Sequence, residues 1–176
     1  RLDGETSGLT MLARSAEVCA RLGQALVEGR IERRYLARVV GVSEASGRID
    51  LRIGKSAGQG APMMRAYPME STAGDSAVSH FWCLDTLHPA CGAQSLVLVR
   101  LETGRTHQVR VHLMASGHPI VGDLLYGGPP FERLALHATA LDLVHPRTAK
   151  RLTLVAALPS GFWPQPVPDW TQSIAP

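Results

Sequence analysis

Short apolar runs separated by turn residues set the strongest limit on how this chain can fold. They occupy residues 8–13, 35–40, 48–53, 78–84, 95–101, 136–144 and 151–157. Runs of this length, bounded by Gly, Pro, Ser and Asp, are typical of β-strands. We therefore predict a sheet of several strands, in which residues 145–150 form the loop of a proline-containing hairpin between the last two.

One segment near the start has the features of a helix. Ser15 is suited to cap it, Val18, Leu22 and Leu26 follow at helical spacing, and Gly29 is suited to end it. We predict a helix between Ser15 and Gly29.

Residues 105–116 are ambiguous. The letters VRVHL alternate as in a strand, whereas Thr106 could cap a helix that Gly117 ends. The four-residue spacing of Val109 and Leu113 favours the helix. The proline-rich tail from residue 158 is predicted to be irregular and packed on the surface.

Composition excludes some classes of protein and leaves others open. The 176 residues, 45% hydrophobic and 19% charged, suit one globular domain with a core. No apolar run reaches the length of a membrane span. With 18 Lys and Arg against 15 Asp and Glu, the net charge is +3. This balance permits a polyanionic partner without requiring one.

Cysteine and histidine spacing gives no sign of a metal site. Cys19, Cys83 and Cys91 form no CxxC pair, which predicts free thiols in a reducing compartment. The seven histidines form no HExxH or zinc-finger pattern. We therefore expect no metal site.

Residues 1–9, RLDGETSGL, place a carboxylate, Asp3, beside Gly, Thr and Ser. Asp and Ser side chains bond to nearby backbone and Gly tolerates unusual dihedrals, so the segment is suited to a tight turn. The residues alone leave open a structural turn or an active-site turn.

This segment resembles the RLDxxTSGL signature of the RluA-type pseudouridine synthases. Residues 34–37, RYLA, are similar to the family's [KR]-Y-x-A segment. Residues 101–113, LETGRTHQVRVHL, with GHPIVGD at 117–123 and LYG at 125–127, resemble its LxTGRTHQIRVHL…GHPIxGDxxYG block. Residues 136–146 resemble its LHAxxLxFxHP hairpin, in which we interpret His137 as part of the scaffold.

The resemblance implies a fold and a reaction. The fold is α+β, with a large mixed, mostly antiparallel sheet, flanking helices and a central cleft. The reaction is isomerisation of uridine to pseudouridine in a structured RNA, ribosomal or transfer, after the base is flipped into the cleft. The implied protein is cytoplasmic and uses no cofactor; its oligomeric state stays open, with a monomer favoured at full length. Residues 1–176 are expected to be its catalytic domain without the front segment, leaving an unpaired strand edge or an apolar groove near residues 1–13.

The resemblance also implies roles for individual residues. Asp3 is the catalytic carboxylate, as nucleophile or base, Tyr35 stacks on the base and assists deprotonation at C5, and Arg105 pairs with Asp3. The implied RNA-binding residues are Arg1, Thr6, Arg34, His107 and Arg110.

The implied pairing of Asp3 with Arg105 has a physical basis. Closing a nucleotide over a carboxylate removes water and favours its neutral form. A guanidinium within about 4 Å opposes this and orients the carboxylate. The alternative is a surface ion pair of roughly 0–1 kcal/mol.

Residues 54–76 are dense in Gly, Ser, Ala and Pro and are predicted to form a long loop carrying Lys55 and Arg65. The loop is either a solvated excursion or a flap that touches the RNA backbone. Two other functions stay open for the whole chain: an RNA-binding fragment without catalysis, and a metal-dependent hydrolase that metal analysis would reveal.

Overall fold

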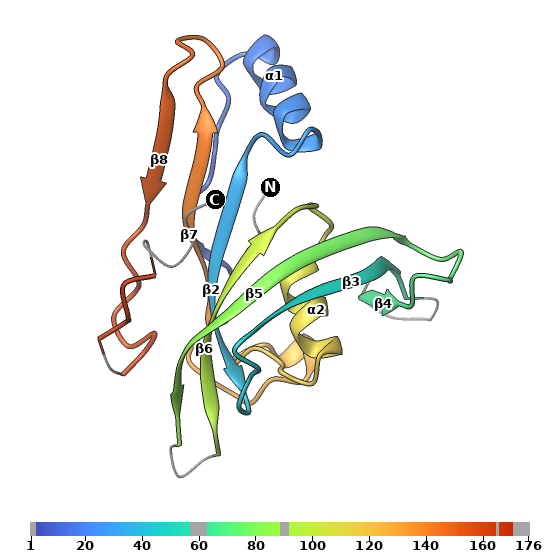
Figure 1. The fold of residues 1–176 in the computed structure, drawn as a ribbon, viewed down its shortest axis with the longest axis vertical. Helices are drawn as coiled ribbons and strands as arrows, with labels where there is room; N and C mark the ends of the chain where they lie inside the picture. The colour runs from blue at the N-terminus through green and yellow to red at the C-terminus, as the bar shows by residue number, and fades with distance from the viewer. Residues whose placement is uncertain (1–2, 57–62, 89–91, 165, 171–176) are drawn as a thin grey trace.

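The computed structural model describes residues 3–56, 63–88, 92–164 and 166–170. Two α-helices and a short 3-10 helix accompany one sheet (Figure 1). In chain order the elements in this part of the chain are β1 (Ser7–Gly8), α1 (Ala16–Val27), β2 (Glu32–Val40), β3 (Ser46–Lys55), β4 (Met64–Tyr67), β5 (Asp75–Leu87), β6 (Gln94–Leu101), α2 (Gln108–Ala115), η1 (Leu124–Tyr126), β7 (Leu136–Val144) and β8 (Arg151–Val155).

The strands of the described residues form a single sheet of eight in the order β1-β7-β2-β6-β5-β3-β4, with β8 also paired to β7. Every pair is antiparallel except β1 with β7. Helix α2 packs on β3, β4 and β5, while α1 lies at the other end of the molecule, near β7 (Figure 1). The predicted mixed, mostly antiparallel α+β sheet is confirmed.

Both predicted helices are present. The Ser15 hydroxyl accepts a hydrogen bond from the N–H of Val18 at 3.3 Å, and Gly29 follows the helix with a φ of +68°. The second helix starts later than predicted, at Gln108. Its N-cap is His107, in the left-handed region with a φ of +56°, and not Thr106.

All but the first of the predicted strands form at close to their predicted places; β2, β3, β5 and β6 are longer than predicted, β7 has the predicted bounds and β8 ends two residues early, at Val155. The strand expected at residues 8–13 shrinks to Ser7–Gly8. The reason lies in the edge of β7. Strand β1 pairs with His137 and Ala138 of β7, and from Ala140 onward β7 pairs with β8 instead. Residues after Gly8 therefore have no free strand edge to join.

The long loop predicted at residues 54–76 is wrong in three places among the described residues, and its residues 57–62 lie outside them. Gly54 and Lys55 complete β3, the segment Met64–Tyr67 forms β4 beside it, and β5 already begins at Asp75. The apolar residues in this segment explain the difference. Met63, Met64 and Ala66 pack against a small core of Ile53, Ala77, Val111 and Tyr126.

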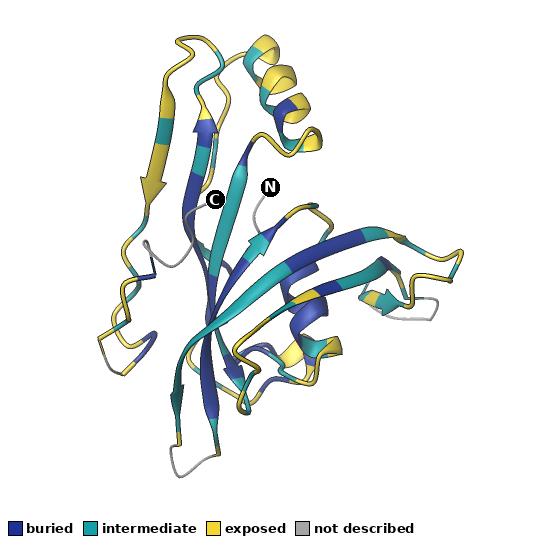
Figure 2. Cartoon of the chain, viewed as in Figure 1, coloured by how far each residue is buried: buried dark blue, intermediate teal, exposed yellow. Residues whose placement is uncertain are grey.

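The described part of the tail contains neither helix nor strand, as predicted, but it does not simply lie on the surface. Phe162, Trp163 and Trp170 are buried in the main hydrophobic core. Trp163 also donates its indole N–H to Asp85 at 2.9 Å. The tail therefore closes the core that runs along β2, β6 and β7, where the dark blue of Figure 2 is concentrated.

His112 is a fully buried histidine between α2 and the sheet. The Ser79 hydroxyl accepts a hydrogen bond from Gln108 at 3.1 Å and lies 2.9 Å from Nδ1 of His112. Burial lowers the pKa of His112 to about 4, although the charge of Asp50 opposes the shift. The neutral imidazole is therefore part of the folded core.

Stability should fall in mild acid because of His112. The unfolded chain binds a proton at this residue near pH 6.5 and the folded chain only near pH 4. The free energy of unfolding should therefore decrease between about pH 7 and about pH 4, by up to roughly 3 kcal/mol from this residue. Urea unfolding of His112→Gln should show a weaker pH dependence than wild type, while His88→Gln, at an exposed position, should keep it. An unchanged slope in His112→Gln would contradict the assignment.

Candidate functional site

The turn that carries Asp3 is fastened to β7. The N–H of Thr6 donates to the carbonyl of Asp3 at 3.0 Å and closes the turn. The Ser7 hydroxyl then lies 2.7 Å from Nδ1 of His137, and the N–H of Leu9 donates to the carbonyl of Ala138 at 2.9 Å. His137 is buried, which agrees with its predicted scaffold role. The turn is thereby held at a defined place on the sheet.

Gly8 is the residue that lets the turn approach β7 so closely. Its φ is +103°, and a Cβ atom at this position would lie 2.2 Å from the carbonyl oxygen of Ala138. Both the backbone conformation and the space exclude a side chain. The Thr-Ser-Gly letters thus have three separate functions: Thr6 is buried, Ser7 bonds to the sheet, and Gly8 makes room.

A pocket opens beside this turn, and residues distant in sequence meet there. The Asp3 turn, strand β2 and the start of α2 each contribute residues to its lining. The lining residues are Asp3, Thr6, Arg33, Tyr35, Leu101, Gly104, Arg105, His107, Gln108, Val109 and Leu136. The structure therefore brings together Asp3, Tyr35 and Arg105, the three residues predicted to be catalytic.

His107 faces the carboxylate of Asp3. Its Nε2 lies 3.9 Å from Oδ1 of Asp3, and its Nδ1 lies 2.9 Å from the hydroxyl of Tyr126. That hydroxyl accepts the N–H of Met64 at 3.2 Å, so its own proton can be donated to Nδ1. In that arrangement Nε2 carries the remaining proton and points it toward Asp3. The sequence analysis marked His107 for RNA binding, matched Tyr126 to the family block without giving it a role, and gave no signal for Met64.

The predicted pairing of Arg105 with Asp3 is not formed. Arg105 donates from Nε to the carbonyl of Ser76 at 3.0 Å, and its Nη1 lies 3.6 Å from the carboxylate of Asp75. The cause is the early start of β5, which brings Asp75 and Ser76 to this side of the pocket. The Asp75 side chain is 72% exposed, so the pair contributes little to stability.

Tyr35 lies in the pocket wall with Arg33 on the same face of β2. Burial raises the pKa of Tyr35, the charge of Arg33 lowers it and that of Asp3 raises it further. The phenol is therefore neutral at physiological pH. Arg33 was missed by the sequence analysis, although its position two residues before Tyr35 puts it on the same face of a strand.

The remaining residues predicted to bind RNA lie in different surroundings. Thr6 is buried, and Arg34 pairs with Glu32 and, at 3.2 Å, with Asp142. Arg110 is also buried, so contact of its guanidinium with an outside polyanion is not supported by this conformation. Arg1 lies outside the described residues.

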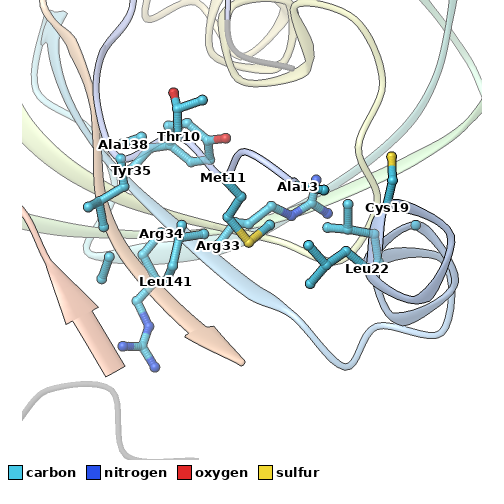
Figure 3. Close-up of a pocket in the computed structure, with 14 residues that line it drawn as sticks. Thr10, Met11, Ala13, Cys19, Leu22, Arg33, Arg34, Tyr35, Ala138 and Leu141 are labelled. Atoms are coloured by element: carbon cyan, nitrogen blue, oxygen red, sulfur yellow. The ribbon is translucent and has the colours of Figure 1, made fainter. Parts of the chain in front are cut away.

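A second, mostly apolar pocket of about 250 Å³ borders the first (Figure 3). Leu9, Met11, Leu22 and Leu141 contribute to its lining. Among the described residues, Arg33 and Tyr35 alone line both pockets. The apolar groove expected near residues 1–13 is thus present beside residues 9–13. Arg33 and Tyr35 form the boundary between an apolar and a charged compartment.

Metal-binding clusters and membrane-spanning helices are both absent from the described residues. In that part of the chain, no group of three or more His, Cys, Asp or Glu side chains is arranged to hold a metal ion. None of its helices combines the length and the apolar character needed to cross a bilayer. Cys19 and Cys83 are free thiols, and Cys91 lies outside the described residues.

Residues 1–115, which include Asp3, Tyr35 and the Gly104–His107 loop, match the family of RNA pseudouridylate synthases. The chain belongs to this family. It is 38% identical over 178 residues to the ribosomal large subunit pseudouridine synthase D of Pseudomonas aeruginosa, covering 92% of this chain and 53% of that protein. An uncharacterized RNA pseudouridine synthase of Chloroflexus aurantiacus is 40% identical over 166 residues, with 92% and 50% covered.

The fold agrees with the family. The structure of human RNA pseudouridylate synthase domain containing 1 superimposes with a TM-score of 0.77 at 30% identity, over 90% of this chain and 67% of that one. Human RNA pseudouridylate synthase domain containing 4 gives a TM-score of 0.73 at 25% identity, over 92% and 71%. The predicted pseudouridine synthase fold is confirmed. The chain spans about half the length of the two bacterial relatives.

Substituting Gly8 should displace the Asp3 turn. Gly8→Ala forces a methyl group toward the Ala138 carbonyl and strains the backbone, and we expect a loss of at least about 2 kcal/mol in the free energy of unfolding. Gly4→Ala is the matched control, because a Cβ there meets nothing within 4 Å. Chemical denaturation measures both, and equal stabilities for the two variants would refute the close approach.

Removing the Tyr126 hydroxyl should disturb His107. Tyr126→Phe leaves Nδ1 of His107 and the N–H of Met64 without their shared partner, at a cost of about 1–3 kcal/mol. Tyr67→Phe, which removes an exposed bond to the Lys55 carbonyl, should cost less. The His107 ring resonances in NMR should shift in Tyr126→Phe only; shifts of equal size in both variants would argue against the contact.

Proposed function

We propose that the protein containing this chain converts uridine to pseudouridine in ribosomal RNA, with Asp3 as the catalytic residue. The observation that supports this most directly is the position of its carboxylate. It is held by an anchored turn at a pocket that a neutral phenol, Tyr35, and two guanidinium groups, Arg33 and Arg105, also line. A structural turn would not require this convergence.

The proposed reaction is an isomerisation, so its atoms balance without a co-reactant. The target uridine leaves the base stack and enters the pocket. Asp3 begins cleavage of the bond between C1′ and N1, as nucleophile or as base. The uracil rotates, C5 bonds to C1′, and the hydrogen on C5 is lost to solvent while N1 gains a proton.

Tyr35 is suited to two tasks in this sequence. Its ring can stack on the uracil, because aromatic side chains hold flipped bases in this way. Its pKa is raised by burial, so the hydroxyl keeps its proton and can exchange hydrogen bonds with a base that changes orientation. Assistance in removing the C5 proton is proposed only as a relay, in which the hydroxyl passes its own proton on as it takes up the one from C5, because a phenol that keeps its proton is not itself a base.

Arg105 is proposed to act on the bound RNA. Its guanidinium lines the pocket, and among the described residues it is held only by an exposed carboxylate and one carbonyl. Such a group is available to a phosphate or to a base oxygen. His107 is proposed to act on Asp3, since its Nε2 faces the carboxylate.

Ribosomal RNA is preferred over transfer RNA as the substrate because several relatives carry the name of ribosomal large subunit pseudouridine synthase. Loss of catalysis, the alternative considered from the sequence, has no support in the site, because Asp3 and Tyr35 are both present in the pocket. A cytoplasmic location for the protein remains a prediction.

Asp3→Asn in the full-length protein should abolish pseudouridine formation. Tritium release from ribosomal RNA labelled at C5 of uridine measures the reaction. Glu5→Gln is the matched control: it makes the same change of charge two residues away, on a side chain that is 74% exposed. We expect the control to retain activity. Asp3→Asn activity above about a hundredth of wild type, a barrier change below roughly 2.7 kcal/mol, would rule out the assignment.

A further inference from the structure

Arg33 is a cation in the pocket wall with no carboxylate partner among the described residues. Its Nη2 donates to the carbonyl of Thr103 at 3.0 Å, and its Nε is buried without any acceptor there. The neighbouring Arg34, by contrast, has two carboxylates. Thr103 is a neutral partner, so the charge of Arg33 is not compensated inside the described part of the protein.

Gly104 shows how closely the guanidinium is fitted into the loop. A Cβ atom at residue 104 would lie 2.5 Å from Nη1 of Arg33 and 3.4 Å from its Cζ. The side chain of Arg33 therefore occupies the space that any other residue at 104 would need. Arg33 thereby lines the pocket together with Asp3 and Arg105.

The face of the sheet determines where Arg33 can act. Arg33 is the register partner of Leu101, which pairs in turn with Ser79 and then Ile49, so these side chains share the face covered by α2. Arg34 and Arg48 belong to the next row and lie on the opposite face. Arg33 thus lines the pocket that holds Asp3, whereas Arg34, which lines only the apolar pocket, and Arg48 do not.

A half-buried cation without an anion costs free energy. Burial lowers the pKa of Arg33, because the charged form has lost water without gaining a carboxylate. An anion that enters the pocket would supply the charge that the described residues do not give to Arg33. The anion that RNA supplies is the phosphodiester, and a planar guanidinium binds phosphate oxygens well.

We infer that Arg33 binds a phosphodiester next to the target uridine, with Nη1 as the donor left free by Thr103 and Gly104. The inference rests on the proposed function, since it takes RNA as the substrate. Arg33 also borders the apolar pocket, so a phosphate held there lies between the compartment that receives the target base and the apolar one beside it. A contact with a uracil oxygen is the competing assignment, and it involves no substrate charge.

The salt dependence of binding separates charge neutralisation from other roles. The full-length protein and its Arg33→Gln and Arg48→Gln variants are titrated with the shortest ribosomal RNA fragment that wild type modifies, at several salt concentrations. Arg48 is paired with Asp50 on the opposite face, so its variant controls for net charge. The logarithm of the RNA association constant falls as the logarithm of the salt concentration rises. For Arg33→Gln the steepness of this fall should decrease by about one, whereas Arg48→Gln should keep the wild-type steepness.

A neutral linkage identifies the phosphate itself. The same RNA is synthesised with a single methylphosphonate on the 5′ or the 3′ side of the target uridine. Wild type should lose about ten-fold in affinity at one of the two positions, and Arg33→Gln should lose nothing further there, because contacting groups are not additive. Gly104→Ala, which displaces the guanidinium and leaves its charge in the protein, should give the same loss of coupling and serves if Arg33→Gln does not fold.

Two results would overturn the inference. One is a wild-type salt dependence of binding in Arg33→Gln. The other is that the losses from the variant and from the neutral linkage add at both positions. Either result would favour a base contact or a purely structural role for Arg33. Tritium release by wild type is measured separately. Its absence would refute the proposed function, whereas normal release with an unchanged salt dependence would refute only the role of Arg33.

Discussion

The buried ion pair between Arg110 and Asp123 connects the parts on which the pocket depends. Nε and Nη2 of Arg110 each donate to one carboxylate oxygen at 2.7 Å, and both side chains are almost fully buried. Asp123 also accepts the N–H of Tyr126, and Arg110 lies over the Tyr126 ring. Helix α2 is thus joined to the loop that holds Tyr126, which in turn contacts His107 and, through it, faces Asp3. Nη2 of Arg110 also lies 3.9 Å from a carboxylate oxygen of Glu5, which belongs to the Asp3 turn itself.

Strand β2 contributes in a different way, because its two faces carry arginines with opposite uses. Arg34 is neutralised by carboxylates and stabilises the sheet, whereas Arg33 faces the pocket next to Tyr35 without such a partner. A run of two arginines therefore does not form one basic patch. The alternation of the strand assigns one to structure and leaves the other for an anion from outside.

Much of the fold could be predicted from the sequence, because apolar runs and helix caps are local signals. Ser15 and Gly29 marked the first helix correctly, and the runs marked most strands. The failures were non-local. β4 forms because Met63 and Met64 pack in the small core that contains Tyr126. β1 ends at Gly8 because β8 occupies the edge of β7 beyond it. Both depend on residues far apart in the sequence, so a local pattern of neighbouring residues cannot reveal them.

The same distinction holds for the site. The motifs identified the residues that meet in the pocket, including Asp3 and Tyr35, but not their contacts. The bond from Arg105 to Ser76 depends on where β5 begins, and the contact of His107 with Tyr126 depends on the left-handed backbone at residue 107. Arg33 was overlooked because only the structure shows which arginine has a carboxylate and which does not.

The parallel pairing of β1 with β7 has a consequence for the order of events during synthesis. Ser7 and its partner His137 are 130 residues apart, so the peptide that holds Asp3 leaves the ribosome long before the strand that receives it. Contacts of such long separation form late, because closing the intervening chain costs entropy that only the finished sheet repays. The antiparallel strands between them can pair as they emerge. The Asp3 side of the pocket is then completed only after residue 137 has emerged, and a nascent chain that stops before it has the carboxylate without the place that it occupies.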